Sequence, residues 1–91
     1  MDVEKKIEMA IEKFNKYRYP EAFARLEEVS SKTIRVSFEG IFKETCGFYD
    51  YFEDLLVFLD ELGIDAWIEE IQETEEGADV IFSLEIAGGG I

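Results

Sequence analysis

Histidine is absent from this chain of 91 residues, and cysteine occurs once, as Cys46. The absence of histidine excludes a histidine general base, a Ser-His-Asp or Cys-His catalytic arrangement and a His-ligated zinc site. A single cysteine excludes an intramolecular disulfide and is typical of a reducing compartment. We therefore interpret Cys46 as an inert, partly buried thiol.

The sequence also lacks long apolar runs. The longest run covers residues 55–59, far fewer than the roughly 20 residues that a membrane-spanning helix needs. The first residues do not contain the apolar segment of an export signal. Three consecutive glycines at 88–90 have no helix after them, so they are not a phosphate-binding loop. We expect a cytoplasmic protein without a cofactor and without membrane association.

Basic residues are scarce and unevenly placed. The chain has 22 acidic and 9 basic residues, a formal charge of −13. Residues 1–45 contain nine acids and nine bases, whereas residues 46–91 contain thirteen acids and no base. Direct nucleic-acid binding is not expected, because phosphate recognition needs a patch of Lys and Arg. One asparagine and one glutamine beside abundant glutamate favour a thermophilic source.

Apolar periodicity predicts three helices. Apolar residues at helical spacing indicate a first helix over residues 2–17. Pro20 suits the first turn of a second helix, and a short helical pattern follows it to residue 29. The best-defined helix begins at Phe48 or Asp50 and ends at Leu62, with Gly63 as its C-terminal cap.

Alternating apolar residues predict three strands, over residues 32–39, 64–74 and 79–87. The strand over residues 64–74 is expected either to be apolar on both faces in part or to contain a bulge near Glu69 and Glu70. Gly77 is expected to have a positive φ in the last hairpin. No internal repeat is apparent. The predicted fold is α+β with the order α-α-β-α-β-β, its helices covering one face of a mostly antiparallel sheet. It forms one domain over residues 1–87, with a flexible tail at 88–91.

Six carboxylates concentrate the negative charge on the last hairpin. These hairpin acids are Glu69, Glu70, Glu73, Glu75, Glu76 and Asp79. Four interpretations stay open: solvation, pairing with the basic residues of the first half, recognition of a cationic protein, and binding of a divalent cation. The spacing of a calcium loop is missing. Carboxylates are too abundant for adjacency to identify a catalytic pair, so no catalytic residue is predicted.

Apolar residues make up 47% of a chain that is short for an isolated domain, which favours a homodimer. Residues 46–60, followed by the acidic hairpin, resemble a small acidic archaeal orphan protein family of unknown function. That resemblance implies an intertwined α+β homodimer in which strands of both subunits contribute to shared sheets. It implies no activity and no functional residues.

These observations together predict a non-enzymatic, acidic, homodimeric interaction protein that binds a cationic protein partner. One alternative is a divalent-cation binding protein, or a small metal-dependent enzyme, that uses the hairpin acids. Another alternative is a mimic of nucleic-acid charge that occupies the binding site of a basic protein.

Overall fold

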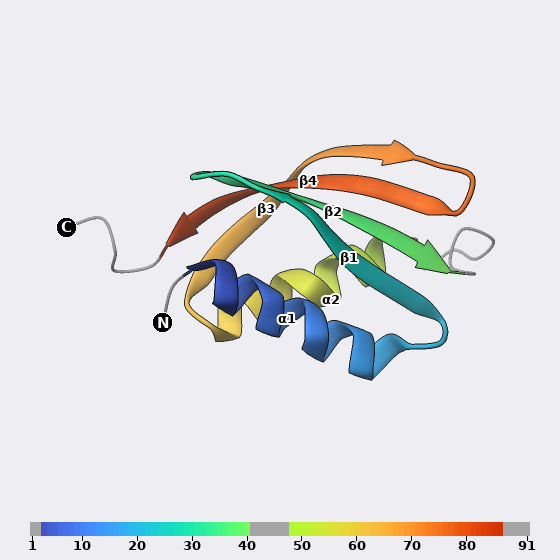
Figure 1. The fold of residues 1–91 in the computed structure, drawn as a ribbon, viewed down its shortest axis with the longest axis horizontal. Coiled ribbons are helices and arrows are strands. Elements are labelled where there is room, and N and C mark those ends of the chain that lie inside the picture. The colour runs from blue at the N-terminus through green and yellow to red at the C-terminus, as the bar shows by residue number, and fades with distance from the viewer. Residues whose placement is uncertain (1–2, 41–47, 87–91) are drawn as a thin grey trace.

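The computed structural model describes residues 3–40 and 48–86, which form two helices and four strands. In chain order the elements are α1 (Val3–Arg18), β1 (Ala22–Val29), β2 (Thr33–Gly40), α2 (Phe48–Glu61), β3 (Ile64–Glu73) and β4 (Gly77–Ile86). The strands form one antiparallel sheet of order β1-β2-β4-β3. Both helices cover the same face of this sheet and leave the other face open (Figure 1). The predicted α+β class is therefore confirmed, whereas Cys46 and the tail at 88–91 lie outside the described residues.

The predicted second helix is wrong, because residues 22–29 form strand β1 and the element order is α-β-β-α-β-β. A register shift between Leu26 and Glu28 adds one residue to this strand. Such a bulge interrupts the alternation that normally identifies a strand. The apolar residues on the helix-covered face of β1 are Ala22, Ala24, Leu26 and Val29. Positions 22, 26 and 29 of this set also match the period of a helix, which explains the error.

The core lies between the two helices and the sheet. Phe38 of β2 is at its centre, with ring centroids 5.5 Å from Phe14 of α1 and 4.8 Å from Phe52 of α2, both edge-to-face. Eighteen apolar residues are buried, and no polar or charged residue of the described chain is buried with them. The core is thus filled by residues of one chain.

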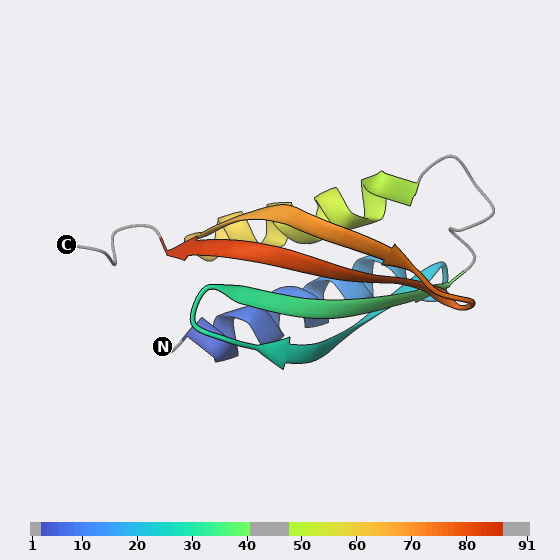
Figure 2. The same ribbon diagram turned by 90° about the horizontal axis from the view of Figure 1, so that it is seen from above.

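The molecule contains two copies of an αββ unit, α1-β1-β2 and α2-β3-β4. Adding 42 to the residue numbers of β1 and 46 to those of β2 converts each of the seven β1–β2 residue pairs into a residue pair between β3 and β4. Ala24 opposite Phe38, for example, corresponds to Ala66 opposite Leu84. The central strands β2 and β4 lie side by side, so the units are related by an approximate twofold axis through the sheet (Figure 2).

The bulges and the helices follow the same repeat. The second bulge, between Ile68 and Glu70, is the bulged alternative expected for this strand, and it occupies the position of the first. The buried triplets of the helices are Ile7, Ala10 and Phe14 in α1 and Phe52, Leu55 and Leu59 in α2. The expectation that the chain has no internal repeat is therefore wrong. Connections of different length separate the matching segments, so the repeat has no single period.

Gly63 and Gly77, near the ends of helix and strand, are needed for different reasons. Gly63 has a φ of 84° two residues after the end of α2, which confirms its predicted role as a cap. Gly77 is not among the glycines with positive φ, and that prediction is wrong. Instead, a Cβ atom on Gly77 would overlap the backbone carbonyl of Phe38 on the neighbouring strand. Gly77 is thus required for close strand approach.

Candidate interaction surface on the open face of the sheet

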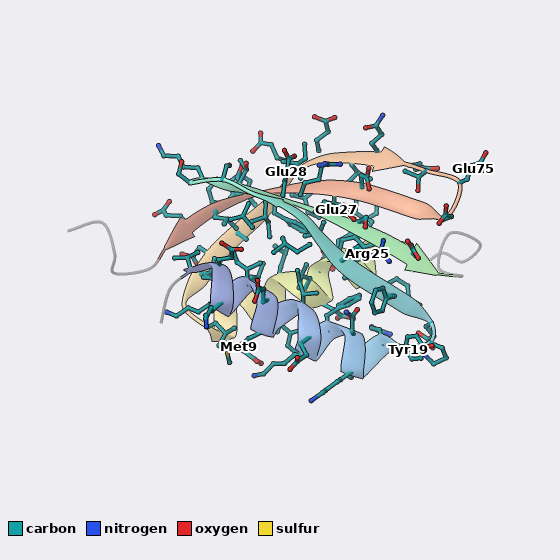
Figure 3. All side chains as sticks on the ribbon, viewed as in Figure 1. Met9, Tyr19, Arg25, Glu27, Glu28 and Glu75 are labelled. Carbon is teal, nitrogen blue, oxygen red and sulfur yellow. The ribbon has the colours of Figure 1, made fainter. Side chains whose placement is uncertain are left out.

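The face of the sheet opposite the helices, here called the open face, is strongly acidic. Strand alternation and register place eight carboxylates on it against two guanidinium groups. The carboxylates are Glu27, Glu28, Glu39, Asp65, Glu69, Glu70, Asp79 and Glu85, and the guanidinium groups are Arg25 and Arg35. Figure 3 labels Glu27, Glu28 and Arg25 on strand β1. The open face therefore carries an excess of negative charge.

The structure divides the hairpin acids into groups instead of one cluster. Glu69, Glu70 and Asp79 lie on the open face. Glu73 pairs with the buried Ala78 and lies on the side of the helices. Glu75 and Glu76 lie in the turn between β3 and β4, where Figure 3 labels Glu75 at the tip. Only half of the predicted set shares a surface.

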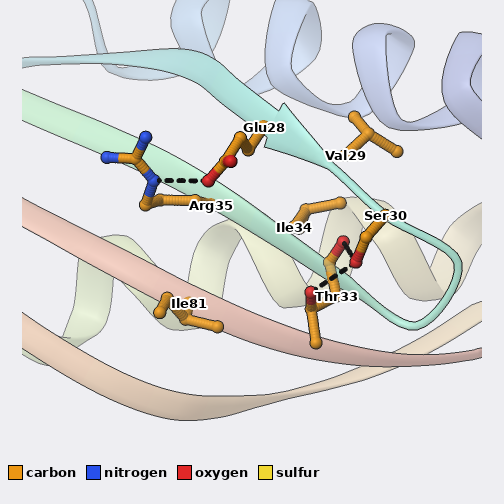
Figure 4. A pocket seen from close by; sticks show the side chains of 7 residues that line it. All are labelled: Glu28, Val29, Ser30, Thr33, Ile34, Arg35 and Ile81. Atoms are coloured by element: carbon orange, nitrogen blue, oxygen red, sulfur yellow. Dashed lines mark hydrogen bonds and ion pairs between the residues drawn. The ribbon is translucent and has the colours of Figure 1, made fainter.

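Arg35 of β2 bridges two carboxylates across the open face. Its Nε lies 3.1 Å from Glu28 Oε1, and its Nη1 lies 3.7 Å from Asp79 Oδ2. Arg35 also lines a small depression of about 210 Å³ beside Thr33 and Ile81 (Figure 4). Because Arg35 already contacts two carboxylates, its positive charge is compensated locally, and the depression does not offer an anion site.

Both bulges present an oriented glutamate. Ser37 Oγ donates a hydrogen bond to Glu27 Oε2 at 2.9 Å, and Ser83 Oγ donates one to Glu69 Oε1 at 2.5 Å. Ser37 and Ser83 are equivalent in the repeat, so the two αββ units each fix one carboxylate on the open face. Sequence analysis identified Glu69 and missed Glu27. The repeated Glu-Glu pairs at 27–28 and 69–70 were the signal that could have indicated it.

The open face also contains exposed apolar groups. The side chain of Trp67 on β3 is 47% exposed. It pairs with Ser83, and the half-buried Ile81 lies on the same face of β4. An indole surrounded by carboxylates can stack on a guanidinium or ammonium group that the carboxylates attract. Sequence analysis did not single out Trp67 as a surface residue.

Some of the basic first half pairs with the acidic second half. Arg18 Nε donates a hydrogen bond to Asp54 Oδ2 at 2.6 Å, and its guanidinium lies over the rings of Tyr17 and Tyr51, 4.9 and 4.7 Å from their centroids. Lys13 and Glu61 form a weaker pair at 4.0 Å. The interpretation of internal pairing is therefore correct for these residues, which join α1 to α2.

Most hairpin acids do not take part in such pairing. Asp79 contacts Arg35, whereas Glu69, Glu70, Glu73 and Glu76 form no ion pair with any base in residues 3–40 and 48–86. Within the described residues, no base neutralises the charge of these four carboxylates. This charge remains available to attract a cationic partner.

Tyr51 of α2 also contacts the short segment that joins α1 to β1. Its hydroxyl donates a hydrogen bond to Glu21 Oε1 at 3.1 Å. Burial, this hydrogen bond and the negative charge of Glu21 together raise the pKa of Tyr51 above its usual value. The neutral phenol is thus the form that the fold stabilises.

Residues 3–40 and 48–86 contain no group of three or more acidic or cysteine side chains arranged to hold a metal ion. No helix in this part of the chain combines the length and the apolar character needed to cross a bilayer. Comparison with known proteins found no matching family model and no matching curated protein. The resemblance to an acidic archaeal family therefore stays a prediction.

Proposed function

We propose that this protein is a non-enzymatic interaction protein whose open face binds a cationic segment of a protein partner. The observation that carries this proposal is the uncovered sheet face, with eight carboxylates against two guanidinium groups. Such a surface attracts a basic partner over distances of about one Debye length, roughly 10 Å at 0.1 M salt.

The exposed side chain of Trp67 favours partner binding over the interpretation that the acidic residues serve only solubility. A face that only keeps the protein soluble needs carboxylates and has no need for a half-exposed indole. Aromatic residues are enriched where partners bind, and an indole adds a cation–π contact to the attraction of the neighbouring carboxylates. Trp67 and Ile81 therefore supply short-range contacts, while Glu69 and Glu70 supply long-range attraction.

We further propose that two copies associate through the first αββ unit. Of the eight exposed large apolar side chains among the residues that the structure describes, five belong to residues 9–29: Met9, Tyr17, Tyr19, Phe23 and Val29. Residues 1–45 have no net charge, so two copies meet there without the repulsion expected between their acidic halves. Because the core is filled within one chain, this dimer does not need exchanged strands.

The binding proposal is tested by titrating a peptide of alternating Lys and Arg while recording the fluorescence of Trp67, the single tryptophan. The open-face variant Glu69→Gln/Glu70→Gln/Asp79→Asn removes three charges. The matched variant Glu73→Gln/Glu75→Gln/Glu76→Gln removes three charges from the rest of the hairpin. We expect the open-face variant to weaken binding by about tenfold and the matched variant by less than about threefold. Equal effects would contradict the proposed surface.

A further inference from the structure

The two outer edges of the sheet differ at positions that the repeat makes equivalent. At the β1 edge, Asn15 of α1 contacts the backbone of Ala24 twice. Its Nδ2 donates to the Ala24 carbonyl oxygen at 2.9 Å, and its Oδ1 accepts from the Ala24 amide at 2.7 Å. This side chain satisfies the backbone as a neighbouring strand would, so the β1 edge is closed at this point.

At the β3 edge the equivalent backbone is open. Ala66 corresponds to Ala24, and it lies opposite Leu84. The Leu84 amide donates to the Lys32 carbonyl at 2.7 Å, on the side of Leu84 away from β3. Ala66 and Leu84 are thus a pair without mutual hydrogen bonds, and the N–H and C=O of Ala66 point outward from the sheet.

Asp60 replaces asparagine at the position that closes the first edge. The buried helix triplets are related by a shift of 45 residues, which makes Asp60 of α2 the counterpart of Asn15. A carboxylate accepts hydrogen bonds but donates none, so it cannot satisfy both backbone groups of Ala66. Within residues 3–40 and 48–86, no hydrogen bond joins Asp60 to Ala66.

A shallow groove runs between α2 and this open edge. Its volume is about 410 Å³, and it is lined by Leu56, Val57, Asp60, Asp65 and Ala66. The Val57 side chain is 55% exposed. The groove therefore combines an apolar floor, two carboxylates and an unpaired backbone segment.

We propose that an extended basic segment of a partner protein adds to β3 as a fifth strand. Its backbone pairs with Ala66, its apolar side chains contact Leu56 and Val57, and its Lys or Arg side chains reach Asp60 and Asp65. This inference rests on the proposed function and narrows it to an extended segment at one edge. Charge selects the occupant, because a second copy of β3 would bring like carboxylates together.

The test uses an acetylated heptapeptide of alternating Lys and Val and an otherwise identical peptide with alternate backbone amides N-methylated. Both peptides carry the same charge, but the second cannot complete a strand ladder. We expect N-methylation to weaken binding by about tenfold or more, since several backbone hydrogen bonds are lost. The unmethylated peptide is also expected to slow hydrogen exchange of the Ala66 amide, measured by NMR.

A second comparison uses the protein itself. Asp60→Asn places an asparagine opposite Ala66, as Asn15 stands opposite Ala24, and is expected to close the edge and weaken peptide binding by about fivefold or more. Glu53→Gln removes one charge from an exposed position on the same helix and is expected to change binding by less than about twofold.

The outcomes separate this inference from the proposed function. If the methylated peptide binds as tightly as its parent, or if Asp60→Asn binds like the wild type, strand addition is overturned. The open-face variant then still tests the proposed function. If neither Lys-Val peptide binds, strand addition is overturned, and the proposed function fails as well only if the Lys-Arg peptide also does not bind. If Asp60→Asn instead abolishes self-association in light scattering, the edge belongs to a second copy of this chain and the inference is overturned.

Discussion

At the residue scale, Arg18 of α1 makes several of the polar and aromatic contacts that join the two αββ units. Its guanidinium contacts the Asp54 carboxylate and lies over the rings of Tyr17 and Tyr51. The sequence alone did not pair Arg18 with Asp54, which lies 36 positions further along the chain. Contacts of this kind depend on how the helices meet, which local spacing does not encode.

The raised pKa of Tyr51 predicts a loss of stability at alkaline pH. The folded state holds the phenolic proton more tightly than the unfolded chain, whose tyrosine pKa is 10.0. This contribution to stability is therefore complete below about pH 10 and disappears as the pH rises through the pKa of the folded state. We expect Tyr51→Phe to cost about 1 kcal/mol at pH 8 and to lose less stability than the wild type between pH 9 and 11. Urea unfolding between pH 8 and 11 measures the stability of both proteins. If the stability of Tyr51→Phe and of the wild type fell in parallel with pH, Tyr51 would not be the group responsible.

At the scale of elements, β1 and β3 show where sequence patterns succeed and fail. Both strands have apolar residues on the core face at relative positions 1, 3, 5 and 8, with a bulge before the last. In β3 the neighbouring hairpin signal favoured a strand, and a bulge was one of the two alternatives expected. In β1 the preceding Pro20 favoured a helix start, and the same spacing was taken for a helical period. The pattern itself is ambiguous, and only pairing with β2 decides it.

The inner face of α2 gives a stability prediction at the same scale. Leu55 and Leu59 are fully buried, whereas Val57 is 55% exposed. We expect Leu55→Ala or Leu59→Ala to lower the free energy of unfolding by roughly 2–5 kcal/mol. Val57→Ala, the control on the other side of the helix, is expected to cost less than about 1 kcal/mol. Urea unfolding measures the free energy of unfolding of all three variants. A similar loss at all three positions would show that the orientation of α2 described above is incorrect.

At the scale of the whole molecule, the charge asymmetry was visible in the sequence, but the surface that carries it was not. The thirteen acids of residues 46–91 could be counted directly. Which of them share a face depended on strand order and on the bulge at Glu69, so Glu73, Glu75 and Glu76 were grouped with residues that point elsewhere. Glu27 and Glu28 belong to the same face but come from the half without net charge. Sheet order brings these glutamates together, and no local pattern specifies that order.

Self-association through the first αββ unit is a further prediction at this scale. Light scattering at micromolar concentration is expected to give twice the mass of the 10.5 kDa chain. Tyr19→Ser together with Phe23→Ser, which removes two exposed rings 6.3 Å apart, is expected to give the monomer mass with the fold retained. The open-face variant serves as the control and is expected to stay dimeric. A monomer mass for the wild type at all concentrations would contradict this assembly.

The most direct test of the central claim is the salt dependence of the association rate with the Lys-Arg peptide, followed by stopped-flow fluorescence of Trp67. If the open face attracts the partner, the rate falls steeply as salt rises from 0.02 to 0.5 M, by about tenfold or more. The open-face variant, Glu69→Gln/Glu70→Gln/Asp79→Asn, then binds more slowly at low salt, and its rate depends less on salt. The matched variant, Glu73→Gln/Glu75→Gln/Glu76→Gln, keeps most of the wild-type rate and most of its salt dependence. An unchanged rate and salt slope in the open-face variant would contradict the account.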